Sequence, residues 1–186
     1  MSLVRKMFSV RIPMERIAVL IGKNGSVKEE IERVSNTMIK IDSSTGEVTV
    51  DDSNIANPEM GLRTRDVIRA IGRGFSPERA FRLFDPGTYL EIIDIKEFVG
   101  RNSKRAKTVR GRLIGSGGKT RRLIEEMSES YVSIYGNTAS LIGDYIQNEI
   151  SRESILMILR GNQHSTVYKY LERKRRDLRL SKLDSI

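Results

Sequence analysis

The sequence predicts an α+β protein that consists of two similar modules in tandem, each with a three-stranded sheet and three helices. The first observation behind this prediction is a repeat. Leu20–Gly25 and Leu113–Gly118 share the pattern Leu-Ile-Gly-x-x-Gly and lie 93 positions apart. The second observation is that apolar residues downstream return at the same offset, with Ile31 matched by Ile124. A repeat of this kind indicates a duplicated structural unit.

Local patterns predict the elements of the first module. Residues 8–12 alternate between apolar and polar side chains and favour a strand. Pro13 suits the first turn of a helix that ends before Gly22. A second helix is expected from Ser26, where Ser26 and Glu29 have the spacing of a capping box. Two strands around a turn and a third helix follow, at 38–42, 47–50 and 60–71.

The second module repeats this order after a join. Gly72 and Gly74 end the third helix, and a short helix and a turn follow up to Gly87. Asp144 is expected to cap the last helix of the second module, which Gly161 ends. The resulting boundaries are 1–74 for the first module, 75–87 for the connecting helix and turn, 88–161 for the second module, and 162–186 for a basic C-terminal helix.

Composition narrows the possible functions. The formal net charge of +9 favours a polyanionic partner, either nucleic acid or an anionic membrane surface. The chain has no cysteine and one histidine, His164, so disulfides and the common zinc sites are not expected. It has no run of about 18 apolar residues, so no membrane-spanning segment is expected. A cytoplasmic location is compatible with this composition.

The order strand, helix, Gly-x-x-Gly, helix, strand, strand, helix resembles the type I KH domain, an RNA-binding module whose glycine loop clamps a nucleic-acid backbone. Glycines allow the protein backbone to approach a phosphodiester closely, and the N-terminus of the following helix favours phosphate oxygens. The resemblance implies RNA-binding residues in both loops and in the basic stretch around the second loop. They are Gly22, Lys23, Asn24, Gly25, Lys107, Arg110, Arg112, Gly115, Ser116, Gly117, Gly118, Lys119, Arg121 and Arg122.

By the same resemblance, unstacked bases are expected on an apolar groove floor beside each loop. The residue pattern is compatible with a floor role and with a core role for each candidate. The candidates are Val19, Ile21, Ile39, Ile114, Val132 and Ile134. The stretch from Arg101 to Arg122 contains no acidic residue, whereas Glu29, Glu30 and Glu32 follow the first loop. Because neutralisation of phosphates dominates affinity, the second module is expected to bind RNA more tightly.

Longer runs resemble a more specific family, the archaeal Dim-two (partner-of-Nob) factors of pre-rRNA processing. These runs are Ile71–Glu78, Arg110–Gly115, Val132–Gly136 and Ile158–Gly161. The resemblance covers nearly the whole chain. It implies a ribosome-assembly factor that binds the 3′ end region of small-subunit rRNA, works beside a PIN-domain endonuclease, and is linked to the alpha subunit of translation initiation factor two. Eukaryotic relatives have lost the first glycine loop, which is intact here, so RNA and protein both stay open as ligands of the first module.

Three alternatives belong to other functional classes. An accessory KH subunit of an RNA-decay complex usually has an S1-type barrel, and no series of short strands remains to build one. A protein-interaction scaffold would use the first module and the basic C-terminal helix. An enzyme is not expected and no cofactor is implied. The sequence shows no clustered carboxylates or histidine pair for metal-assisted cleavage, and Gly117–Thr120 lacks the upstream glycine of a phosphate-binding P-loop.

Overall fold

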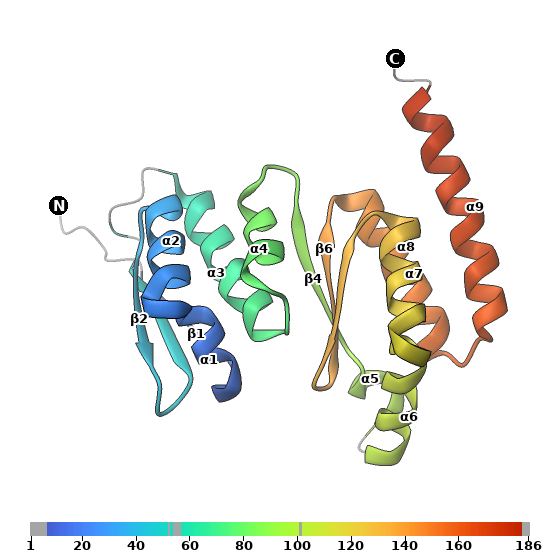
Figure 1. Cartoon of the computed structure of the whole chain (residues 1–186), viewed down its shortest axis with the longest axis horizontal. Helices are drawn as coiled ribbons and strands as arrows, with labels where there is room; N and C mark the ends of the chain where they lie inside the picture. The colour runs from blue at the N-terminus through green and yellow to red at the C-terminus, as the bar shows by residue number, and fades with distance from the viewer. Residues whose placement is uncertain (1–6, 52, 54–56, 101, 184–186) are drawn as a thin grey trace. The chain divides into compact units, whose positions relative to one another are not determined.

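The computed structural model describes residues 7–51, 53, 57–100 and 102–183, and the chain divides into two compact units, Met1–Pro86 and Gly87–Ile186. Each unit contains a three-stranded antiparallel sheet with helices packed against it (Figure 1). The predicted α+β fold class with two tandem modules is therefore confirmed.

The first unit has the predicted order of elements and continues with a further helical segment. Its elements are β1 (Met7–Arg11), α1 (Met14–Ile21), η1 (Lys23–Gly25), α2 (Ser26–Ser35), β2 (Met38–Asp42), β3 (Glu47–Asp51), α3 (Pro58–Gly72), α4 (Pro77–Ala80) and η2 (Phe81–Phe84). The strand order is β1-β3-β2. Val50 pairs with Phe8 on one side and with Ile39 on the other, so apolar residues of all three strands share the face that the helices cover.

Of the expected connection, residues 75–86 lie in the first unit, and Gly87 begins the second. Phe75 and Leu83 are buried, and η2 packs against α3. The guanidinium of Arg63 on α3 donates to the carbonyl oxygens of Leu83 and Asp85, at 2.9 and 2.6 Å. This segment is therefore an ordered extension of the first module, held by both apolar packing and hydrogen bonds.

The second unit repeats the strand order and adds two helices to the basic pattern. Its elements are β4 (Tyr89–Asp94), α5 (Lys96–Val99), α6 (Ser103–Ile114), η3 (Ser116–Gly118), α7 (Lys119–Ser128), β5 (Tyr131–Tyr135), β6 (Thr138–Gly143), α8 (Tyr145–Leu159) and α9 (His164–Leu183). The sheet order is β4-β6-β5. Asp144 caps α8 as predicted, because its carboxylate accepts from the Gln147 backbone N–H at 2.8 Å and the Gln147 side chain accepts from the Asp144 N–H.

The basic C-terminal helix α9 shares the core of the second unit. It packs against α7 and α8 and continues beyond them (Figure 1). Val167 and Leu171 on its inner face are fully buried. Near its first turn, the Nε2 atom of His164 lies 2.9 Å from the carbonyl oxygen of Arg112 on α6. The first half of α9 therefore has a structural role, and its basic residues Lys169 and Arg173 are exposed on the opposite side.

Candidate nucleic-acid interface

The two Gly-x-x-Gly loops have almost the same backbone. In Gly22–Gly25 the first, third and fourth residues have φ angles of 75°, 54° and 85°. In Gly115–Gly118 the corresponding angles are 74°, 55° and 79°. In each loop the amide of the last glycine donates to the carbonyl of the first, at 3.3 and 3.1 Å respectively. The sequence repeat therefore encodes one turn twice.

The two glycines of each loop have different roles. A Cβ atom on Gly22 would lie 2.7 Å from the backbone nitrogen of Val27, and one on Gly115 would lie 2.7 Å from that of Thr120. The first glycine is thus required where the loop packs on the following helix. Beside Gly25, by contrast, the nearest atom to a Cβ would be a side-chain oxygen at 3.4 Å. At the second glycine a Cβ atom would therefore meet no backbone atom, and the space beside it is more open.

Both loops lead into helix N-termini without a side-chain cap. Gly25 and Gly118 occupy the N-cap positions of α2 and α7 in a left-handed conformation. The capping box predicted for Ser26 and Glu29 is wrong, because Ser26 already has helical φ and ψ angles and stands inside the helix. The N–H groups of the first turn are consequently left without a side-chain acceptor, as an anion-binding helix terminus requires.

The charge beside the second glycine is reversed between the modules. In the first loop the carboxylate of Glu29 is the side chain nearest Gly25. In the second loop the guanidinium of Arg122 takes this position, and a Cβ on Gly118 would lie 3.3 Å from its Nη1. The two residues have the same position in the repeat. The second loop therefore offers a cation where the first offers an anion.

Some of the predicted basic residues are exposed without an ion pair, and others bond to groups of the protein itself. Lys107, Lys119 and Arg122 are exposed and make no ion pair with other described residues. Arg121 pairs with Glu125 at 2.7 Å. Arg110 donates to the Gly136 carbonyl at 2.7 Å but remains partly exposed.

Arg112 has a structural role. Its guanidinium donates to the carbonyl of Ile158 at 3.2 Å and to the carbonyl of Asn162, which satisfies acceptors where α8 ends. Lys23, Asn24, Ser116 and Gly117 are exposed at the loop tips. Arg101, the first residue of the basic stretch, lies outside the described residues.

The structure separates the six groove-floor candidates. Ile39 and Val132 are 2% exposed and belong to the cores of their units. Ile114, at the end of α6, is 38% exposed. The remaining candidates are partly buried: Val19, Ile21 and Ile134. Among the candidates of the second unit, Ile114 and Ile134 therefore keep some exposed surface, whereas Val132 does not.

Two glutamates that lie 93 positions apart, like the loops, each connect a loop helix to the sheet. Glu32 on α2 accepts from the backbone N–H of Ile39 at 2.6 Å, and Glu125 on α7 accepts from that of Val132 at 2.8 Å. Both bonds reach the edge strand that borders the predicted groove. The repeat spacing of the two glutamates indicates that they have equivalent places in the two modules. The spacing alone does not reveal that each accepts a backbone hydrogen bond from a strand.

Among the described residues, no three His, Cys, Asp or Glu side chains gather as a metal site would require. Within the same residues, no helix has the length and apolar character needed to cross a bilayer.

Comparisons with known proteins agree with this geometry. A profile of the eukaryotic-type KH domain, type I, matches residues 89–176, and a general KH-domain profile matches residues 7–56. A KH domain-containing protein of Methanocaldococcus jannaschii is 38% identical over 176 residues, which are 94% of this chain and 77% of that protein.

Solved structures extend the match. Dim2p from Pyrococcus horikoshii is 49% identical, with a TM-score of 0.84 over 91% of this chain and 99% of that one. A second structure, of an a/eIF2alpha–aDim2p–rRNA complex from the same organism, is 47% identical, with a TM-score of 0.88 over 95% and 97% of the two chains. The fold and its paired glycine loops define a tandem KH-domain protein. The chain belongs to the archaeal Dim2p-type family of such proteins.

Proposed function

We propose that the chain is a non-catalytic RNA-binding factor of small-subunit assembly, which clamps single-stranded rRNA through its Gly-x-x-Gly loops. The observation that carries the proposal is the second loop. It combines an open second glycine, an uncapped helix N-terminus and the exposed cations Lys119 and Arg122. These features favour phosphate oxygens. The P. horikoshii complex, in which a protein 47% identical to this one is found with rRNA, supports the proposal.

The preferred ligand is a single strand from the 3′ end region of small-subunit rRNA. A loop that holds the backbone leaves the bases to the adjacent surface, where Ile114 and Ile134 offer apolar contacts. A duplex keeps its bases stacked and cannot use that surface. The alpha subunit of translation initiation factor two and a PIN-domain endonuclease are the proposed protein partners, and the P. horikoshii complex supports the first of them.

The test is binding of a labelled single-stranded oligonucleotide from this rRNA region, measured by fluorescence anisotropy across a salt series. The decisive variant is Ser116→Asp with Gly117→Asp, which places two carboxylates at the loop tip. Its fold should persist, because Asn24 holds a side chain at the matching φ angle in the first loop. We expect the double variant to bind roughly tenfold or more weakly, since each carboxylate opposes a phosphate.

A scrambled strand and the corresponding duplex serve as controls. Selective binding of the cognate strand, lost in the double variant, supports the clamp. Equal binding of all three nucleic acids, or an unaltered double variant with an intact circular dichroism spectrum, contradicts it.

A second candidate function applies to the first module alone. The carboxylate of Glu29 beside Gly25 opposes a phosphate, which favours a protein-binding role for this loop. The matched variant is Lys23→Asp with Asn24→Asp. If it leaves RNA affinity unchanged while the second-loop variant loses it, the first module acts as a scaffold. An equal loss in both variants assigns RNA to both loops.

A further inference from the structure

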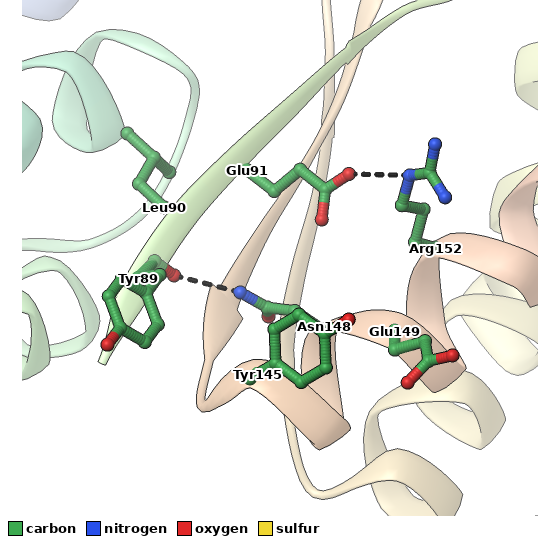
Figure 2. A pocket seen from close by; sticks show the side chains of 7 residues that line it. All are labelled: Tyr89, Leu90, Glu91, Tyr145, Asn148, Glu149 and Arg152. Atoms are coloured by element: carbon green, nitrogen blue, oxygen red, sulfur yellow. Dashed lines mark hydrogen bonds and ion pairs between the residues drawn. The ribbon is translucent and has the colours of Figure 1, made fainter. Parts of the chain in front are cut away.

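A pocket unrelated to the glycine loops lies between β4 and α8 of the second unit (Figure 2). Its volume of about 380 Å³ is within the range of ligand-binding pockets. One wall is the edge strand β4, and the other is a single face of α8 that includes Tyr145, Glu149 and Arg152. The second unit thus has a concave site formed by elements that do not contribute to the loops.

Two tyrosines give the pocket its aromatic character. Tyr89 is 57% exposed and Tyr145 is 74% exposed, and both rings lie toward one end of the pocket (Figure 2). The strand that carries Tyr89 is fixed to α8, because Asn148 Nδ2 donates to the Tyr89 carbonyl at 3.1 Å. Aromatic faces carry negative electrostatic potential and attract cations. Exposed tyrosines on an ordered framework are typical anchors of interfaces.

The charged groups of the pocket leave a net negative charge on a chain whose formal charge is +9. Glu91 pairs with Arg152, with Oε1 2.8 Å from Nε. Burial raises the pKa of Glu91, and the nearby Arg152 counteracts only part of this effect. Glu149 is exposed and has no ion-pair partner among the described residues. The pocket therefore contains two carboxylates. The charge of Glu91 is only partly stabilised by Arg152, and Glu149 has no ion-pair partner among the described residues.

We propose that this pocket binds a basic side chain, arginine in particular, presented by a protein partner. A guanidinium can stack on the tyrosine faces while its N–H groups donate to carboxylate oxygens, and this planar group suits both contacts better than an ammonium. The negative charge disfavours a nucleic-acid phosphate in the same place. The site is thus a protein-docking point, separate from the proposed RNA surface and independent of it.

The test uses N-acetyl-arginine amide as the probe and the full ¹⁵N-labelled chain. The signals to follow are the side-chain amide of Asn148 and the Nε–H of Arg152, in two-dimensional ¹H–¹⁵N spectra. We expect saturable shifts of both signals with the arginine probe. The neutral isostere N-acetyl-citrulline amide, which has nearly the same shape, should bind several-fold more weakly because the carboxylates then lack a cation.

Two substitutions assign the binding to the pocket. Tyr145→Ala removes one ring and Glu149→Gln removes the free charge, and each should weaken the probe several-fold. Ile146→Ala is the matched control. It alters the next residue of the same helix, which is also exposed but does not line this pocket. None of the three changes should alter affinity for the single-stranded oligonucleotide.

Three results would overturn the proposal. The first is the absence of shifts up to the solubility limit of the arginine probe. The second is equal binding of the citrulline compound, which would show that charge has no part. The third is binding of adenosine or uridine monophosphate at the same signals while arginine has no effect, together with loss of oligonucleotide affinity in Tyr145→Ala. That last result would make the pocket a nucleotide site.

Discussion

The hydroxyl oxygen of Tyr168 on α9 lies 3.0 Å from Oγ1 of Thr120, the second residue of α7. Thr120 is buried next to the second glycine loop, and both its hydroxyl oxygen and its backbone nitrogen would overlap a Cβ atom at Gly115. The first module has Val27 at the equivalent position, which offers no hydroxyl. The C-terminal helix therefore supports the second loop from behind in a way that the first module lacks.

Tyr168→Phe should lower stability by about 1 kcal/mol, because it deletes one neutral hydrogen bond to a buried threonine. Thermal unfolding followed by circular dichroism measures this loss. Amide exchange at Gly118 and Lys119 should accelerate in parallel if α9 steadies the loop. Tyr170→Phe is the control on the same helix, since the hydroxyl of Tyr170 makes no hydrogen bond with another described residue. An unchanged melting temperature for Tyr168→Phe would mean that the hydrogen bond between Tyr168 and Thr120 does not stabilise the second unit.

Glu125→Ala should destabilise the second unit by roughly 1–3 kcal/mol, since the N–H of buried Val132 loses its acceptor. Chemical denaturation gives the free energy of unfolding. Glu126→Ala changes the adjacent acid, whose exposed ion pair with Arg175 is 3.3 Å long, and should cost less than about 1 kcal/mol. Equal effects of the two substitutions would mean that the bond to β5 contributes nothing specific.

Alanine substitutions should separate a required glycine from a dispensable one. Gly115→Ala should cost roughly 1–3 kcal/mol, because its φ is +74° and the new Cβ would overlap Thr120. Gly111→Ala, on the exposed side of α6 with no atom within 4 Å, should stabilise the helix by up to about 1 kcal/mol. Differential scanning calorimetry of the two variants shows the opposite signs directly. A stabilising effect at Gly115 would contradict the loop geometry.

Exchange of the charges beside the second glycines should change RNA affinity in opposite directions. Arg122→Glu removes the cation that we propose lies opposite a phosphate, and it should weaken binding several-fold with a shallower salt dependence. Glu29→Arg should strengthen binding if RNA reaches the first loop. Anisotropy titrations at several salt concentrations measure both quantities. A weaker affinity with an unaltered salt slope would place Arg122 outside the phosphate contacts.

The pKa of Glu91 should rise further in Arg152→Gln, because Arg152 is what lowers it against the effect of burial. A raised pKa means that the folded state holds this proton more tightly than the unfolded chain does. The contribution of Glu91 to stability is therefore complete below its ordinary pKa of 4.5 and is lost as the pH rises through the folded value. NMR titration of the Glu91 side-chain carboxyl carbon, in the unaltered chain and in Arg152→Gln, checks the direction.

The repeat made most of the fold predictable. A glycine loop between two helices, followed by two strands and a helix, could be predicted twice, and Asp144 marked a helix start correctly. The sequence could not indicate that Gly25 occupies the cap position in place of Ser26. That outcome depends on the left-handed backbone of Gly25, which the sequence pattern does not specify.

The sequence does not show which way a side chain points, and this limited the prediction of the site residues. Arg112 belongs to a basic stretch, yet α6 packs beside the end of α8, and its guanidinium satisfies carbonyls there. Arg16 does the same in the first unit, where it donates to Ile71 and Phe75 at the end of α3. Ile39 and Val132 were equally compatible with a floor and a core role until the strand register assigned them to the buried face.

The packing of α9 has a consequence for how the two modules can be separated or exchanged. The first module is completed by the short segment that carries Phe75 and Leu83, whereas the second is completed by a long helix whose Val167 and Leu171 are fully buried. A second module that ends at Gly161 would lack α9, so the apolar surfaces of α7 and α8 that α9 covers would be exposed to solvent. Such a module would tend to aggregate. Any transplant of this module into another protein must carry α9 with it, so the two repeats, alike in their loops, are not interchangeable parts.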